Sequence, residues 1–225
     1  MIEEGCPILV YDDGEDNDEK KSYSPALKRA KQKLSRTETE EISDRTGLDY
    51  IEESSRFEIV SFGEPYYVHH PSGEVDASHS SLPLNRGMEI IFLHFLLEGN
   101  DCPPSGRWMK MKELPDGAPY DGPFHRQAVK PLVRQMGEDP DALKEAAARL
   151  EGEFIDEADI GFKLYPLPDV PLIYLLWRGD EEIEGGANLL FDSSVIIKLH
   201  TEDAAVLGEY ATDLLIRFCE ETKNS

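Results

Sequence analysis

The C-terminal part of the sequence carries the clearest helical pattern. From Ala204 to Phe218, small and apolar residues recur every three or four positions, which predicts an amphipathic helix with one buried stripe and Thr201 as its cap. The other positions are charged, and we expect them to face water with an Asp213–Arg217 pair one turn apart. These charged residues are Glu202, Glu209, Asp213, Arg217 and Glu220.

Three apolar runs before this helix have the length and composition of strands. They are "GFKLYPL", "PLIYLLW" and "NLLFD", and the second is apolar on both faces, as a central strand would be. Short connections favour antiparallel neighbours. We therefore expect Leu172–Trp177 to pair antiparallel with Asn188–Asp192, which places Arg178 and Ser193 at opposite ends of the pair. Asp192 or Ser193 can cap the short turn "SVIIKL".

The first half of the chain predicts a second group of elements. The stretch 84–99 is apolar nearly all round, which predicts a buried central helix that ends at Gly99. A basic helix is expected from Ser24 as cap and Pro25 as first residue, with Leu27 and Leu34 on its buried face. The sequence also predicts a short helix ending near Gly47, a β-hairpin within 57–70, a short strand in "RWMKMKEL", and helices over Phe124–Met136 and Pro140–Leu150.

Together these elements predict an α+β fold rather than a strict βαβ alternation. A mainly antiparallel sheet should pack against the buried central helix and the amphipathic C-terminal helix. Residues 1–21 are expected to be an acidic flexible N-terminal segment, and residues 22–225 a single α+β domain.

Charge and cysteine content narrow the possible partners. The chain has 23 Lys and Arg against 46 Asp and Glu, a net charge of −23, so nucleic acid and anionic membrane are poor partners. Cys6, Cys102 and Cys219 are far apart and have no metal-binding spacing, and the longest apolar stretch is about half a membrane span. We expect a reducing, cytoplasmic location, and no metal site built by this chain alone.

No catalytic motif is evident: the sequence lacks a Gly-rich phosphate loop, a nucleophile elbow, an H-E-x-x-H pair and a Cys/His pair. The histidines at 69, 70 and 79 flank a turn but match no metal motif, and His94 is interpreted as a core residue, with cofactor ligation as the alternative. His200 precedes the last helix, whose positive end favours neutral imidazole. Arg178 follows a buried strand and could reach an anion.

Two loops rich in Gly and Pro, "PPSGRWMKM" and "APYDGPF", could line a pocket or could simply fasten a long loop to the core. Arg107, Trp108 and Tyr120 in these loops offer charge and stacking. With Arg178 and His200 they are the candidate ligand-binding residues, and no catalytic or metal-ligating residue is assigned.

Several of these segments also occur in a known family. "SGRWMKMKELPDGAPYDGPF", "LPDVPLIYLLWRGDEE" and "LLFDSSVIIKLHTEDAAVLGE" resemble the domain-of-unknown-function family 3786 of anaerobic bacteria and archaea, over about residues 25–218. The resemblance implies an anaerobe. Some relatives carry a four-iron–four-sulfur module like that of corrinoid iron–sulfur proteins, but this chain lacks the clustered cysteines. The family offers no established catalytic residues.

The sequence and the resemblance therefore predict a binding or accessory module associated with anaerobic redox or corrinoid metabolism. Its expected partner is a redox or corrinoid/iron–sulfur protein, and its own cofactor and oligomeric state are not predicted. The alternative is an enzyme that acts on a small anionic substrate, with Arg107 and Arg178 as clamps and His200 as acid or base. A third possibility is a purely structural subunit. A binding module requires a pocket lined by the two Gly/Pro loops, whereas the enzyme requires His200 beside an arginine.

Overall fold

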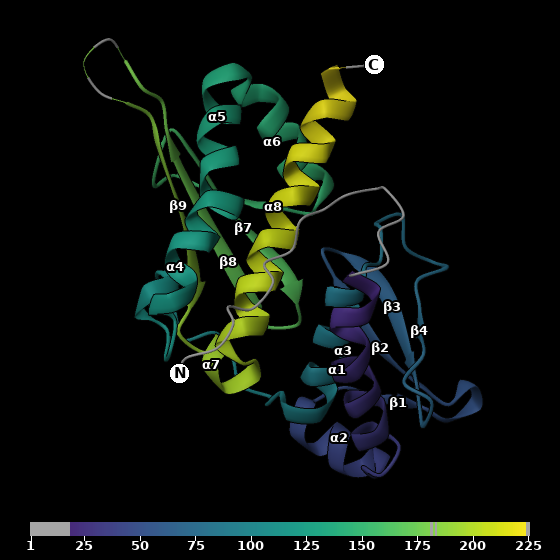
Figure 1. The fold of residues 1–225 in the computed structure, drawn as a ribbon. Coiled ribbons are helices and arrows are strands. Elements are labelled where there is room, and N and C mark those ends of the chain that lie inside the picture. The colour runs from purple at the N-terminus through teal and green to yellow at the C-terminus, as the bar shows by residue number, and fades with distance from the viewer. Residues whose placement is uncertain (1–18, 181, 183, 224–225) are drawn as a thin grey trace.

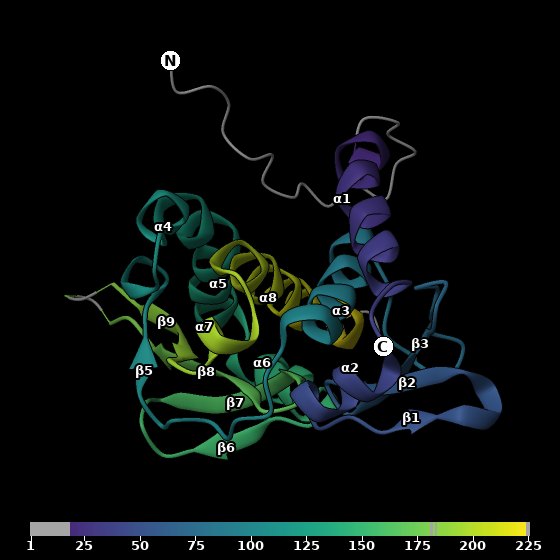
Figure 2. The same ribbon diagram turned by 90° about the horizontal axis from the view of Figure 1, so that it is seen from below.

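Residues 19–180, 182 and 184–223 are described in a computed structural model, with side chains from residue 25 onward. The fold is α+β, as predicted: two antiparallel sheets stand side by side (Figure 1). Seen from below, the strands form one layer, and α1, α3, α4, α5 and α8 lie on the same side of it (Figure 2). Most of the expected acidic N-terminal segment lies outside the described residues.

The first sheet has four strands in the order β1-β2-β3-β4, and the predicted hairpin is its centre. Helices α1 and α3 pack on it, and α2 ends at Gly47 in the left-handed conformation, as expected. The elements are α1 (Glu19–Leu34), α2 (Thr39–Thr46), β1 (Tyr50–Ile51), η1 (Glu52–Ser54), β2 (Arg56–Ser61), β3 (Glu64–His69), β4 (Val75–Asp76) and α3 (Arg86–Glu98).

The second sheet has five strands in the order β5-β9-β8-β7-β6. The predicted antiparallel pairing of β8 with β9 is confirmed, because Leu172 lies opposite Phe191 and Trp177 opposite Gly186. The elements are β5 (Trp108–Met109), η2 (Met111–Glu113), α4 (Ala118–Phe124), the π-helical turn η3 (His125–Val129), α5 (Lys130–Glu138), α6 (Pro140–Arg149), β6 (Glu153–Ile155), β7 (Ile160–Leu167), β8 (Val170–Trp177), β9 (Gly186–Asp192), α7 (Val195–Lys198) and α8 (Thr201–Lys223).

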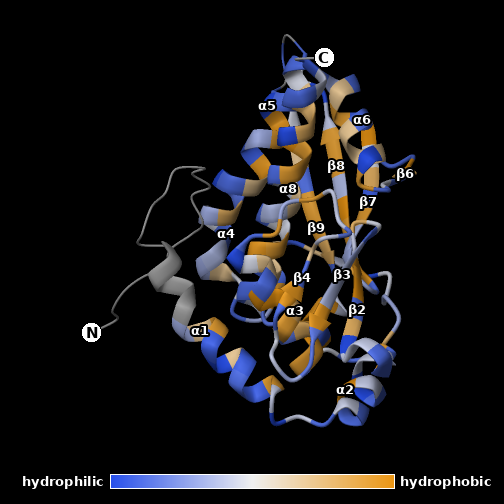
Figure 3. Ribbon diagram, turned by 90° about the vertical axis from the view of Figure 1, so that its right-hand side faces the viewer, coloured by the Kyte–Doolittle hydropathy of each residue, from blue (hydrophilic) through white to orange (hydrophobic). Residues whose placement is uncertain are grey.

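Helix α8 is the centre of the hydrophobic core. Its predicted stripe is buried throughout, and Leu207, Ala211 and Leu215 are completely inaccessible to solvent. Strands β8 and β9 supply the opposing apolar surface and are coloured as hydrophobic along most of their length (Figure 3). The predicted arrangement, two apolar strands beneath an amphipathic helix, is therefore confirmed.

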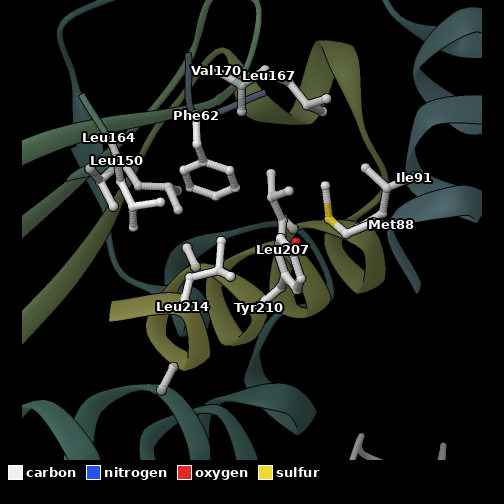
Figure 4. Packing of buried hydrophobic residues seen from close by; sticks show 14 of the residues in the cluster. Phe62, Met88, Ile91, Leu150, Leu164, Leu167, Val170, Leu207, Tyr210 and Leu214 are labelled. Atoms are coloured by element: carbon white, nitrogen blue, oxygen red, sulfur yellow. The ribbon is translucent and has the colours of Figure 1, made fainter. Parts of the chain in front are cut away.

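Phe62 joins the two sheets. It lies in the turn between β2 and β3, and its backbone N–H donates a hydrogen bond to the carbonyl oxygen of Tyr165 in β7, at 3.0 Å. Its ring points toward Tyr210 and Leu207 of α8 (Figure 4), with 6.0 Å between the Phe62 and Tyr210 ring centroids. The buried residues of both sheets thus form one continuous cluster.

Four details differ from the sequence predictions. Helix α1 begins at Glu19, so Ser24 and Pro25 lie inside it rather than at its start. The segment 118–124, expected to be a loop, is helical, because Pro119 occupies the first turn, where its missing N–H costs no hydrogen bond. Glu209 is buried rather than exposed to solvent, and burial raises its pKa to about 7. Arg217 contacts Glu221 instead of Asp213.

Gly208 provides a direct test of the packing around α8. Alanine is the better helix former by about 1 kcal/mol, but a methyl group at position 208 would lie 2.7 Å from the Phe124 ring. We predict that Gly208→Ala lowers the free energy of unfolding by about 1–3 kcal/mol in urea denaturation. Gly137→Ala in α5, where the added carbon meets nothing within 4 Å, is the control and should be neutral or stabilising. A higher free energy of unfolding for both Gly208→Ala and Gly137→Ala would contradict the packing described.

Candidate functional site

A single buried carboxylate fixes the segment that leads into β5. Asp192 ends β9, and Oδ1 accepts hydrogen bonds from the backbone N–H groups of Ser105 and Ser194 and from the Ser105 hydroxyl, at 2.8–2.9 Å. Oδ2 accepts a hydrogen bond from the backbone N–H of Gly106 at 2.7 Å. Burial alone would raise the pKa of Asp192, but hydrogen bonds from Ser194 and Ser105 outweigh it and hold that pKa below its ordinary value. Asp192 therefore fastens the 105–107 turn to the sheet. The predicted capping of the following helix is not found, because the N-cap residue of α7 is Ser194 and no side chain caps it.

The chain then folds back against α4 through a close approach at Gly117. A Cβ atom at this position would lie 2.0 Å from the carbonyl oxygen of Met111, so only glycine fits. Because η2 is held this closely, Lys110, Met111 and Lys112 face the end of α4 and the edge of β9.

These segments enclose a small hollow of about 200 Å³. Its apolar residues are largely buried, whereas Lys110, Lys112 and His125 are exposed. The lining residues are Lys110, Met111, Lys112, Asp121, Phe124, His125, Val129, Ala187, Asn188 and Leu189. A hollow lined by both Gly/Pro segments is what the binding-module hypothesis requires.

The charges around the hollow contrast with the rest of the chain. Residues 105–136 contain six Lys or Arg and three Asp or Glu, although the whole chain has a net charge of −23. Within the described ranges, Lys110, Lys112 and Arg126 form no salt bridge. Asp121 is the one acidic residue in the lining. The hollow is thus locally cationic, and its two lysines have no salt-bridge partner among the described residues.

The structure divides the five predicted ligand-binding residues among several places. Arg107 and Trp108 lie in the turn held by Asp192 and in β5, and Tyr120 lies in α4, so these three frame the hollow without lining it. Arg178 lies at the far end of β8, where its backbone N–H donates to Asp159 at 2.8 Å. His200 lies just before α8, beyond the opposite end of the β8–β9 pair.

The proposed enzyme site is therefore not assembled. Arg178 and His200 are separated by the length of β8, which for eight residues is about 26 Å. An arginine clamp and an acid or base at these two positions cannot act on one small substrate.

A second polar cluster joins α3 to α8. His94 Nδ1 lies 2.9 Å from Oδ2 of Asp203, and His200 Nε2 lies 2.5 Å from Oε2 of Glu98, which also accepts a hydrogen bond from Lys33 at 2.8 Å. The hydrogen bond with Asp203 raises the pKa of His94. Desolvation would raise the pKa of Glu98, but Lys33 and the two histidines lower it overall.

This second cluster fits a structural joint better than a reactive site. Its groups are paired with one another across three helices, and His200 is 67% exposed rather than enclosed in a cleft. Basic groups gather at the C-terminal end of α3: Arg45 donates to the carbonyl oxygen of Leu96, and Lys198 to that of Asn100. Such groups complement the negative end of the helix. Nowhere in the described ranges do three His, Cys, Asp or Glu side chains form a group that could hold a metal ion.

The structure is thus an α+β fold with a small, locally cationic hollow at one sheet edge. The chain belongs to the family described as "Domain of unknown function (DUF3786)", whose family model matches residues 38–213. The resemblance found in the sequence is thereby confirmed. Comparisons with curated proteins and with solved structures gave no match. In the part of the chain that the structure describes, none of the helices combines the length and hydrophobicity of a membrane span.

Sequence reasoning missed Lys110, Lys112 and His125. The alternation in "RWMKMKEL" predicted a strand longer than the two residues of β5. A helix was predicted over Phe124–Met136, but not the π-helical form of η3 within it. The available signal was the local excess of cations between 105 and 136 in an acidic chain.

The Asp192 hydrogen bonds make a testable contribution to stability. Asp192→Asn would place an amide donor among N–H donors, and we predict a loss of about 1–3 kcal/mol in the free energy of unfolding at pH 7. Because the pKa of Asp192 is lowered in the folded state, its contribution is complete above the unfolded pKa of 3.8 and is lost as the pH falls through the folded pKa. The difference between the two proteins should therefore shrink in acid.

Asp159→Asn is the matched control in urea denaturation, since Asp159 accepts one hydrogen bond, from an exposed backbone N–H. Equal losses for the two variants would show that Asp192 does not fasten the turn.

The α3–α8 joint should weaken at high pH. His94 has a raised pKa in the folded state, so its stabilising effect is complete below the unfolded value of 6.5 and disappears as the pH rises through the folded pKa. We predict that His94→Gln lowers stability by about 1–2 kcal/mol at pH 6 and by much less at pH 9. His79→Gln, at an exposed histidine, should change little at either pH. If His94→Gln lowered stability equally at pH 6 and pH 9, the protonated form of His94 would not be what stabilises the contact between α3 and α8.

Proposed function

We propose that this protein is a non-catalytic binding module that accepts an acidic group of a partner protein in the hollow between η2, α4 and β9. The observation that carries the proposal is the pair of free lysines, Lys110 and Lys112, above an apolar floor in a chain that is otherwise strongly acidic. Lysine ammonium groups bind carboxylates and phosphates as point charges. The surrounding negative charge of the chain repels anions elsewhere on the surface, which favours this site.

The size of the hollow supports a side chain rather than a whole metabolite as the occupant. Pockets for small molecules are typically about 300–1,000 Å³, and this one holds about 200 Å³. An aspartate or glutamate side chain fits such a volume, with its stem against Met111 and Leu189 and its carboxylate near the lysines.

The family adds an expected context, which is an accessory role in anaerobic redox or corrinoid metabolism with a corrinoid/iron–sulfur protein as partner. This context rests on the resemblance alone. Of the two cysteines among the described residues, Cys219 is buried with its pKa raised to about 11, and Cys102 is partly exposed at a distant position in the chain. Any cluster in such a complex would therefore be carried by the partner in this proposal.

The proposal is tested by titrating ¹⁵N-labelled protein with a capped diglutamate peptide. We expect chemical-shift changes centred on Lys112, His125 and Asn188, and affinity that falls between about 50 and 300 mM salt as the charges are screened. Lys110→Glu with Lys112→Glu should weaken binding at least tenfold, since each lysine near the carboxylate is worth about 1 kcal/mol in water.

The matched control makes the same charge change on α1, with Lys28→Glu and Arg29→Glu, both exposed. Equal weakening by the two double variants, or shifts scattered over the surface, would contradict a site in the hollow.

A further inference from the structure

Among the described residues, the edge of the second sheet beside the hollow is only partly paired. β9 pairs with β8 from Gly186 to Phe191. On its other side, β5 pairs only with Phe191 and Asp192. Among the described residues, no strand lies against this side of residues 186–190, and no further backbone hydrogen bond engages them.

Alternate residues of an antiparallel strand direct their N–H and C=O groups to opposite sides. Every second residue of 186–190 therefore presents an unpaired donor and acceptor on the outer side of β9. These residues are partly exposed except for Leu189. Five residues of extended backbone, about 17 Å, are available for pairing.

The composition of this edge is unusual for one that stays uncovered. Native proteins protect exposed sheet edges with charges, proline or very short strands. From Gly186 to Phe191 the sequence is "GANLLF", with no charge and no proline. The opposite edge strand, β6, has three residues and begins with Glu153.

From these observations we infer that the partner bound at the hollow is an extended acidic segment that adds a strand to β9 at residues 186–190, beside the place where β5 ends. This inference rests on the proposed function and names the form of the ligand. The segment pairs its backbone with β9, and an acidic side chain enters the hollow, where Lys110 and Lys112 stand at the end of β5. Backbone pairing supplies affinity and the hollow supplies selectivity, as in other cases of strand addition.

The charge complementarity of the site selects this occupant. The hollow end of the edge is cationic, which suits a segment with glutamate or aspartate at that position. The apolar residues Ala187 and Leu189 line the same hollow, so the segment should alternate acidic and β-branched residues.

A capped heptapeptide that alternates glutamate and valine is the probe, with the full chain as the protein. Binding is measured by calorimetry, and hydrogen exchange is followed at the amides of residues 186–190. We expect at least tenfold slower exchange at alternate amides in this range when the peptide saturates the protein. Two N-methylated isomers, blocked at odd or at even amides, are the controls, because they keep every charge. One isomer should bind at least tenfold more weakly than the parent, and the other should bind as the parent does.

The outcomes separate this inference from the proposed function. Equal binding of both isomers and the parent, unchanged exchange, or no binding of the parent at millimolar concentration would overturn strand addition. Loss of parent binding in the Lys110→Glu, Lys112→Glu protein, together with selective loss for one isomer, supports both. Selective loss for one isomer without any effect of the lysine substitutions would support strand addition and contradict the role of the hollow.

Discussion

The hydrogen bonds that converge on Asp192 set the geometry of the candidate site. A carboxylate at the end of β9 holds the backbone of Ser105 and Gly106, so the chain must enter the sheet as β5 at that point. β5 lasts two residues, and the close approach at Gly117 then returns η2 toward α4. The free lysines and the open edge of β9 both follow from this short path. Without the hydrogen bonds of Asp192, the 105–107 turn would not be fixed, and neither would Lys110, which follows β5.

The rest of the molecule serves as a rigid support for this edge. Helix α8 packs against β8 and β9, and Phe62 connects the first sheet to the same core. The ion pairs of His94 and Glu98 hold α3 against α8 and α1. Because these contacts are distributed over both sheets, the side chains around the hollow lie on fixed elements. A preformed site loses less conformational entropy on binding than a mobile loop would.

An element could be predicted from the sequence where its hydrophobic residues recur at a regular spacing and are buried. The stripe of α8, the all-round apolar α3 and the antiparallel strands β7, β8 and β9 could be predicted, because hydrophobic periodicity alone determines them. The site could not be predicted in the same way. It depends on a π-helical turn at His125, on a glycine that fits only because Met111 approaches it, and on the distance between η2 and β9. The burial of Glu209 could not be predicted either, because its helical spacing placed it on the exposed face of α8.

The central claim is that an acidic segment binds at the hollow beside β9, and paramagnetic relaxation tests it most directly. An acidic alternating peptide with a nitroxide at its centre would be added to ¹⁵N-labelled protein, and signal broadening mapped along the chain. The account predicts that broadening is strongest at the amides of Lys112, His125 and Asn188 and absent at the first sheet, for example at Tyr67. Uniform broadening, or broadening centred on the first sheet, would contradict it.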